Sequence, residues 1–87
     1  GVYVTRVVLQ DGRSYAAATN VGVRPTVSNS TRANVESHIL DFSGNLYGQK
    51  ARVEFYSFIR PEMKFDDVQI LSSHIKHDSE TAKNYFA

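Results

Sequence analysis

A tight turn between two strand-like runs constrains this chain more than any other feature. The run Val2–Leu9 is rich in β-branched and aromatic residues, and Gln10-Asp11-Gly12-Arg13 leads from it toward a second such run over residues 15–19. An Asp-Gly pair tolerates the positive φ angles that a hairpin turn demands. The sequence therefore predicts an antiparallel β-hairpin over its first residues.

Two further strands are predicted downstream, after a long polar segment. Residues 20–32 contain Gly22 and Pro25 and predict a loop, and a loop of this length is a candidate functional segment. Side chains then alternate over residues 35–42 and again over residues 51–60, with a turn near Gly44 between them. We expect these two strands to form a second hairpin, which Pro61 ends.

The apolar period becomes helical after Phe65. Val68, Leu71 and Ile75 recur at the spacing of one helix face. Asp66 followed by Gln69 resembles a capping box. We expect a helix over about residues 66–86, in which the polar segment 77–79 is a candidate break.

Size and composition favour one small, mostly β domain. An 87-residue chain buries a single modest core, so residues 1–87 are expected to form one domain, with its strands within 1–60. At least four antiparallel strands and a C-terminal helix predict an open α+β sheet or a small antiparallel β-barrel with a helix packed on it. Four strands are few for closing a barrel.

Charge, cysteine content and hydropathy exclude several classes of protein. A net charge of +1 lacks the cationic excess that drives binding to nucleic-acid backbones, so no nucleic-acid partner is expected. The chain has no cysteine, which excludes a disulfide scaffold, a thiolate nucleophile and a cysteine-ligated zinc site, and fits a cytoplasmic protein. Its apolar runs are far shorter than the ~20 residues of a membrane span, so no membrane partner is expected either.

Glu36 is the first candidate for chemistry, because it is an acidic residue inside a predicted strand. One interpretation is a solvent-facing glutamate paired across the sheet with Arg52, and the pattern alone favours it. The other is a general base, since a strand holds a carboxylate rigidly within reach of a hydroxyl.

Two arginines are the next candidates. Arg24 lies close to Gly22, which would allow a ligand to approach the backbone, and its planar donors suit a phosphate or carboxylate. No phosphate-loop motif is present, so an ordinary turn is the simpler interpretation. Arg60 precedes Pro61 and is either a solvated charge or an arginine held stiffly against a ligand.

Histidines and aromatic residues point more weakly to function. His74 and His77 could share a metal, but a zinc site needs further ligands and only His38 remains, so a metal site is not expected. Tyr56 and Phe58 alternate with arginines and could stack on bases. Core packing is the simpler use for both aromatic residues.

Four segments are recognisable when they are taken in order along the chain. They are Asn20-Val-Gly-Val-Arg-Pro-Thr26, Val35-Glu-Ser-His-Ile-Leu-Asp-Phe42, Asn45-Leu-Tyr-Gly48, and Phe58-Ile-Arg-Pro-Glu62 with Lys64-Phe65-Asp66. In this order they resemble riboflavin kinase, in particular the kinase module that ends bacterial bifunctional riboflavin kinase/FMN adenylyltransferases. The resemblance spans essentially the whole chain.

The resemblance implies a fold, a reaction and a set of residues. The fold is a six-stranded antiparallel β-barrel with a C-terminal helix. The reaction is transfer of the ATP γ-phosphoryl group, with Mg²⁺ or another divalent cation, to the ribityl 5′-hydroxyl of riboflavin, giving FMN. It implies that Glu36 is the catalytic base and that an adenylyltransferase domain lies upstream in the same polypeptide. The residues implied to bind substrate or nucleotide are Asn20, Gly22, Arg24, Thr26 and Arg60.

One departure from the family pattern limits what this chain is expected to do alone. The family's glycine-rich loop and its Pro-Thr-Ala-Asn motif, which hold metal and phosphates, precede the position of Gly1. The segment Ala18-Thr19-Asn20 echoes that motif but belongs to a later part of the module. We therefore expect the C-terminal part of a kinase module, without a metal ligand and inactive by itself. The alternatives are a noncatalytic flavin- or ligand-binding barrel and, more distantly, a nucleic-acid-binding barrel.

Overall fold

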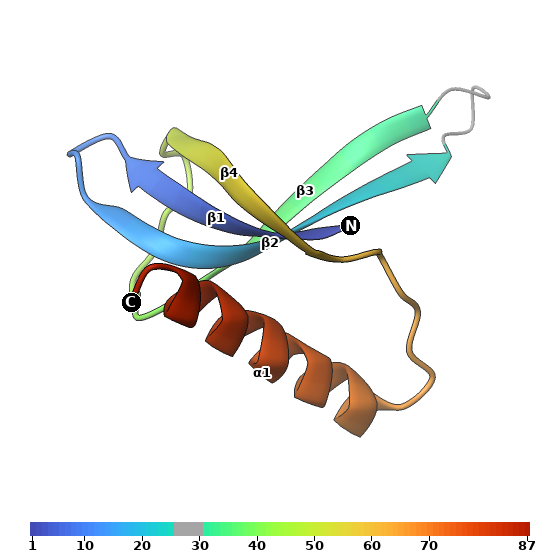
Figure 1. Cartoon of the computed structure of the whole chain (residues 1–87). Coiled ribbons are helices and arrows are strands. Elements are labelled where there is room, and N and C mark those ends of the chain that lie inside the picture. Colours follow the sequence, from blue (N-terminus) through green and yellow to red (C-terminus); the bar gives the residue numbers. More distant parts are fainter. Residues whose placement is uncertain (26–30) are drawn as a thin grey trace.

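The computed structural model describes residues 1–25 and 31–87, which form four strands and one helix (Figure 1). The elements are β1 (Val2–Leu9), β2 (Ser14–Pro25), β3 (Thr31–Ile39), β4 (Ala51–Arg60) and α1 (Val68–Tyr85). The strands form one antiparallel sheet in the order β3-β2-β1-β4, and α1 packs on one face of it. The mostly β fold with a C-terminal helix is thus confirmed. The sheet of the described residues is open, and the six strands of a closed barrel are not seen in them.

The first hairpin forms where the Asp-Gly pair predicted it. The Leu9 amide donates to the Arg13 carbonyl at 2.8 Å, and the Gly12 amide donates to the Leu9 carbonyl at 3.0 Å. Gly12 has a φ of +90°, a conformation that side chains with a Cβ rarely adopt. The turn is closed further by Asp11, whose carboxylate accepts hydrogen bonds from the backbone amide and the side chain of Arg13.

The long loop predicted over residues 20–32 is wrong for most of its length. β2 continues to Pro25 and β3 begins at Thr31, so the two strands pair as a hairpin that extends away from the helix (Figure 1). The loop was predicted because the side chains of residues 20–32 are mostly polar and show no apolar alternation. A hairpin arm that packs on no core needs only its backbone hydrogen bonds, and polar side chains do not disturb those.

The second predicted hairpin is also wrong, because β3 and β4 lie at opposite edges of the sheet. β3 pairs with β2, and β4 pairs with β1. Residues 40–50 cross from one edge to the other, and Phe42 and Leu46 from this connection pack against the core. Burial of these two apolar side chains favours a path across the sheet over a tight turn.

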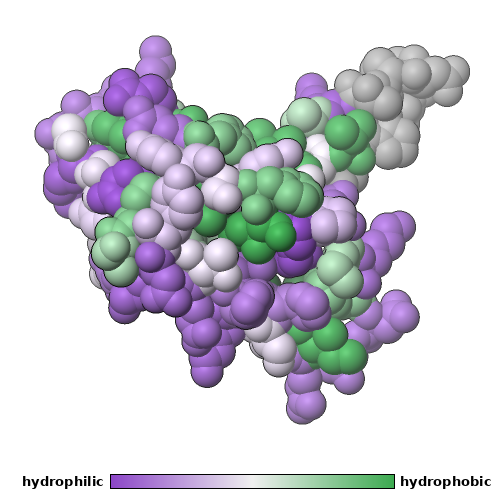
Figure 2. Space-filling model, viewed as in Figure 1, coloured by the Kyte–Doolittle hydropathy of each residue, from purple (hydrophilic) through white to green (hydrophobic). Residues whose placement is uncertain are grey.

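The two faces of the sheet are covered differently. One face carries the core of Val7, Leu9 and Ala17, which the 40–50 connection covers. The other face carries Val2, Val4 and Ala18 toward α1, where Asp78 and Ala82 are buried. The space-filling view shows the molecule hollowed between the β2–β3 arm and the segment that precedes α1 (Figure 2).

Side-chain alternation in β4 is interrupted by two register shifts against β1. The shifts bring Phe55 and Phe58 to the same side, where both rings meet Tyr3 edge-on at 5.3 and 5.4 Å. Tyr56 contacts Phe86 at the end of α1, at 5.0 Å between ring centroids. The alternation predicted over residues 51–60 would place Phe58 on the face of Tyr56. It is wrong at this point, because β-bulges change the period of two.

The helix is continuous, and its N-cap lies one residue later than predicted. Asp67, rather than Asp66, is the N-cap, and its carboxylate accepts from the Gln69 amide at 2.7 Å. No break occurs at residues 77–79, where the Ser79 hydroxyl donates to the Ile75 carbonyl at 2.9 Å. Within the described residues, no helix has both the length and the apolar character needed to cross a membrane.

Candidate functional site

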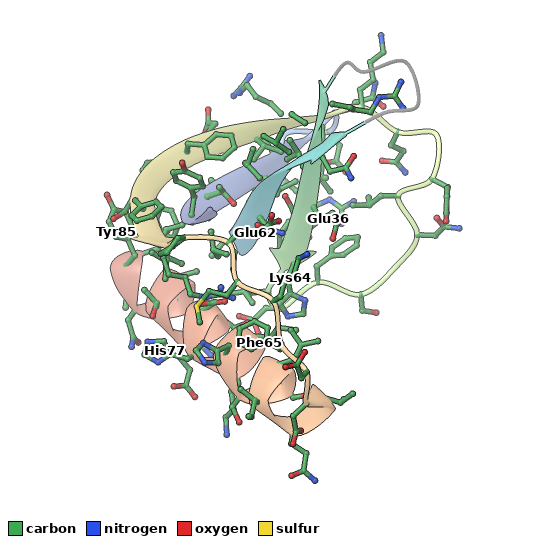
Figure 3. All side chains as sticks on the ribbon, turned by 90° about the vertical axis from the view of Figure 1, so that its right-hand side faces the viewer. Glu36, Glu62, Lys64, Phe65, His77 and Tyr85 are labelled. Carbon is green, nitrogen blue, oxygen red and sulfur yellow. The ribbon has the colours of Figure 1, made fainter. Side chains whose placement is uncertain are left out.

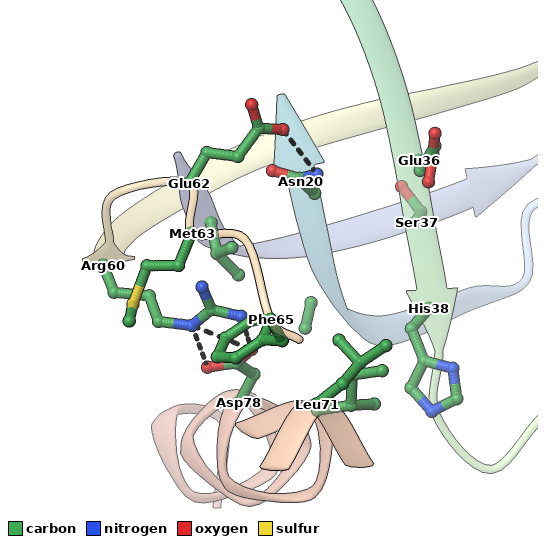
Figure 4. A pocket seen from close by; sticks show the side chains of 13 residues that line it. Asn20, Glu36, Ser37, His38, Arg60, Glu62, Met63, Phe65, Leu71 and Asp78 are labelled. Atoms are coloured by element: carbon green, nitrogen blue, oxygen red, sulfur yellow. Dashed lines mark hydrogen bonds and ion pairs between the residues drawn. The ribbon is translucent and has the colours of Figure 1, made fainter. Parts of the chain in front are cut away.

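A cavity of about 450 Å³ lies between the helix-facing side of the sheet, the segment of residues 61–67 and α1 (Figure 4). The segment 61–67 carries Glu62, Lys64 and Phe65 between the sheet and the helix (Figure 3). One wall of the cavity is apolar and is formed by Met63, Phe65, Leu71 and Ile75. The polar residues that line the cavity are Asn20, Glu36, Ser37, His38, Arg60, Glu62 and Asp78.

Strand register places the polar residues in a row across the sheet. Glu36 on β3 pairs with Asn20 on β2, Asn20 pairs with Val2 on β1, and Val2 pairs with Arg60 on β4. Because neighbouring strands lie about 4.8 Å apart, Glu36 and Arg60 are separated by roughly 14 Å along this row. These two candidate site residues therefore stand at opposite ends of one cavity.

Glu36 is exposed on β3 and lines the cavity. The cross-strand pair with Arg52 is excluded, because Arg52 lies on β4 opposite Val8. The Arg52 Nε instead donates to Glu54 Oε2 at 3.0 Å. The predicted pairing of Glu36 with Arg52 is thus wrong, whereas its predicted exposure to solvent is confirmed. The Glu36 residue also lines the cavity.

Asn20 joins the sheet to the segment before α1. Its Nδ2 donates to Glu62 Oε2 at 3.0 Å (Figure 4). Since a carboxylate only accepts hydrogen bonds, this contact fixes which end of the Asn20 amide carries nitrogen. The Asn20 Oδ1 atom is buried and has no hydrogen-bond partner among the described residues. A buried acceptor without a donor carries an unfavourable desolvation cost.

Arg60 forms a buried ion pair that sequence reasoning missed. Its Nε lies 3.1 and 3.2 Å from the two oxygens of Asp78, and its Nη2 lies 2.8 Å from Oδ2. The side chains of Arg60 and Asp78 are only 17% and 5% exposed. Arg60 is therefore not the solvated charge of the simpler interpretation. The signal for its partner is that Asp78 falls on the same helix face as Leu71 and Ile75, where an unpaired charge would be costly.

The structure gathers only part of the predicted binding set into the cavity. Gly22 lies farther along β2, opposite Asn34, and does not line the cavity. The backbone of Arg24 pairs with that of Arg32 on the same hairpin arm. Thr26 lies outside the described residues. Asn20 and Arg60 line the cavity together with Glu36.

Two of the histidines contact or line the region of the cavity. The His74 ring lies 4.7 Å from the Phe65 ring, between α1 and the preceding segment. His38 lines the cavity two residues after Glu36 on β3. Among the described residues, no three His, Cys, Asp or Glu side chains are gathered as a metal site would require.

Comparison with known proteins gives one consistent family. The family model described as "Flavokinase: Riboflavin kinase" matches residues 1–86. The chain is 43% identical over 86 residues to the bifunctional riboflavin kinase/FMN adenylyltransferase of Haemophilus influenzae, covering 99% of this chain and 28% of that protein. Its identity to the protein of the same name from Pseudomonas fluorescens is 39% over 83 residues, covering 95% of this chain and 26% of that one.

A solved structure is similar over nearly the whole chain. It is titled as a macrolide-efflux protein from Streptococcus pneumoniae, and it superposes with a TM-score of 0.89 at 36% sequence identity. The match covers 97% of this chain and 27% of that chain. The chain thus spans between a quarter and a third of the length of each of these proteins.

Proposed function

Because the chain belongs to the riboflavin kinase family, we propose that it forms the C-terminal part of a riboflavin kinase module. That module transfers the γ-phosphoryl group of ATP to the ribityl 5′-hydroxyl of riboflavin, with FMN and ADP as products. The observation that supports this most directly is the cavity, which combines a strand-borne carboxylate with an apolar wall. Its volume of about 450 Å³ is in the range of small-molecule sites.

The apolar and the polar lining residues of the cavity suit the two parts of riboflavin. The flat tricyclic ring is apolar on both faces and would lie against Met63, Phe65 and Leu71. The ribityl chain carries hydroxyl groups and would extend along the polar row toward Asn20 and Glu36. This orientation brings the terminal hydroxyl to the end of the cavity that holds Glu36.

Glu36 acts as the general base of the proposed reaction. Its carboxylate accepts the proton of the 5′-hydroxyl as the hydroxyl oxygen bonds to the γ-phosphorus, and the bond to the β,γ-bridging oxygen breaks to release ADP. Phosphoryl transfer depends mainly on positioning and on charge neutralisation, so one base in a fixed place is a sufficient proton acceptor. A strand provides that fixed place.

The remaining site residues bind rather than react. Asn20 and Arg60 contribute to the flavin side of the cavity, Arg60 through its ion pair with Asp78. Gly22, Arg24 and Thr26 belong to the hairpin arm and are proposed to contact the nucleotide. ATP and a divalent cation follow from the family, and no residue of this chain is assigned to hold the cation.

The same family membership extends the proposal beyond the cavity. The relatives of this chain are named as bifunctional with an FMN adenylyltransferase, so we place an adenylyltransferase domain in the same polypeptide. Riboflavin and ATP are its small-molecule partners. The reaction is assigned to the cytoplasm, where ATP is plentiful.

A noncatalytic flavin-binding protein is the second candidate, because the cavity alone would suffice for it. Two assays on the complete module separate the candidates. Riboflavin binding is followed by the quenching of its fluorescence, and FMN formation is followed with and without ATP. ATP-dependent FMN formation supports the kinase. Quenching without FMN formation supports the binding protein, and the absence of both rejects the flavin assignment.

A further inference from the structure

Three hydroxyl groups form a hydrogen-bonded chain across β1, β2 and β3. Thr5 Oγ1 lies 2.7 Å from Thr19 Oγ1, and Thr19 Oγ1 lies 2.8 Å from Ser37 Oγ. Thr5 and Thr19 have no exposed surface, and Ser37 is half-buried. Buried hydroxyls are costly unless each is hydrogen-bonded, and here each of the three is.

The direction of the chain follows from its inner end. Thr5 Oγ1 also lies 3.2 Å from the Ala17 carbonyl, and a carbonyl oxygen can only accept. The Thr5 hydroxyl therefore donates its single hydrogen to the Ala17 carbonyl and accepts from Thr19. The Thr19 hydroxyl in turn accepts from Ser37. Hydrogen bonds arranged in one direction polarise and strengthen one another. Ser37 is thereby the donor that ties β3 to the buried part of the sheet.

The Thr19–Ser37 hydrogen bond reaches β3 at the residue next to Glu36. Ser37 directly follows Glu36 on β3, and its hydroxyl is hydrogen-bonded to Thr19. Both Glu36 and Ser37 line the cavity (Figure 4). In the described sheet, β3 is paired on one side only, to β2. The Thr19–Ser37 hydrogen bond therefore adds a side-chain link between β2 and β3 directly next to Glu36.

We propose that Thr19 and Ser37 are positioning residues for Glu36. The inference rests on the proposed function, because it assumes that the Glu36 carboxylate is the general base. Thr19 does not line the cavity, whereas Ser37 does, and in this proposal both act by fixing the backbone of β3 at Glu36. Small displacements of a catalytic group are expensive, since about 1 Å can cost 10²-fold in rate.

The test is steady-state kinetics of Thr19→Val in the complete module. Valine has nearly the shape of threonine but lacks the hydroxyl, so it removes the middle of the hydrogen-bonded chain. We expect kcat to fall about tenfold or more while the KM for riboflavin changes little, because the cavity wall is untouched. Thr19→Ser restores the hydroxyl and is expected to recover most of kcat.

Two further variants separate positioning from general damage. Thr81→Val is the matched control, because the Thr81 hydroxyl donates to the His77 carbonyl within α1, away from the cavity. Its kcat is expected to equal that of the wild type. In a Glu36→Gln background, Thr19→Val is expected to cause no further loss, since a residue that acts through Glu36 has nothing left to position.

Each outcome decides the inference. A folded Thr19→Val variant with wild-type kcat overturns it, as does a loss of equal size with and without Glu36. If Thr19→Val does not fold, Ser37→Ala is measured instead. Because Ser37 also lines the cavity, a raised KM for riboflavin, or a loss of kcat that persists in the Glu36→Gln background, overturns the positioning role. Wild-type activity of Glu36→Gln alone would instead reject the base assignment of the proposed function. Loss of activity in Glu36→Gln with full activity in Thr19→Val would reject only the positioning role.

Discussion

Arg60 and Asp78 join the end of β4 to the middle of α1 through a bidentate ion pair, in which Nη2 and Oδ2 are 2.8 Å apart. The pair is largely buried, and the Arg60 guanidinium also lies 5.6 Å from the Phe65 ring. It therefore connects the sheet, the helix and the segment between them. These are the three elements that enclose the cavity, so the pair stabilises the helix in the position that forms the apolar wall.

Removal of either partner is expected to destabilise the fold. Arg60→Ala leaves the buried Asp78 charge without its partner, and we expect the free energy of unfolding to fall by about 3 kcal/mol. Arg60→Lys is expected to recover little of it, because an ammonium group cannot bridge both carboxylate oxygens as a guanidinium does. Urea unfolding of the complete module measures both variants. The double variant Arg60→Ala/Asp78→Ala should lose less than the sum of the single losses, and strict additivity would contradict a direct pair.

Local signals predicted the elements whose ends are set by backbone chemistry. Gly12, with its positive φ, lies in the turn of the first hairpin, and Pro61 follows the last residue of β4, both at the expected positions. The arm of residues 20–25 was missed because polarity reports burial rather than hydrogen bonding. The pairing of β3 with β2 could not be derived from alternation, which defines the two faces of a strand but not its neighbour.

The site was predictable only to the extent that it is local. Glu36 was recognised as a carboxylate on a strand, but its place beside Asn20 depends on register across β2 and β3. The partner of Arg60 lies eighteen positions away on another element, as Asp78. An acidic residue on an apolar helix face signals a buried partner, yet nothing local identifies which cation that is.

The hairpin turn is expected to show its own pH dependence through Asp11. The backbone amide of Arg13, and then its guanidinium, donate to the Asp11 carboxylate and hold its pKa below the ordinary value. A carboxyl whose pKa is lowered by folding stabilises the fold above its unfolded pKa. That contribution is lost as the pH falls through the folded pKa. Since Asp11 is exposed, the effect on stability is expected to be small.

An NMR titration of the Asp11 carboxyl carbon checks this assignment. Arg13→Gln keeps the backbone amide but removes the guanidinium, so the Asp11 pKa is expected to rise only part of the way toward its ordinary value. A full return to the ordinary value would show that the guanidinium, rather than the backbone amide, dominates.

The 87-residue chain by itself is expected to form no FMN from riboflavin and ATP. The resemblance assigns phosphate and metal binding to a glycine-rich loop and a Pro-Thr-Ala-Asn motif, and neither occurs in this sequence. The measurement is an ATP-dependent FMN assay on the purified chain, with the complete module as the positive control. Turnover that copurifies with the chain through several columns would show that the phosphate site has been placed wrongly.

Glu36→Gln is the variant that bears most directly on the proposed chemistry. Glutamine keeps the size of the side chain but cannot accept the hydroxyl proton, so kcat of the complete module is expected to fall by about 10²–10⁴-fold. Because Glu36 is exposed, the free energy of unfolding should change by less than about 0.5 kcal/mol. The fluorescence of riboflavin should still be quenched when it binds the variant. The matched control is Glu54→Gln, which makes the same change on β4 next to Arg52 and outside the cavity. If both variants turn over at the wild-type rate, Glu36 is not the base, and the proton of the 5′-hydroxyl must leave by another route.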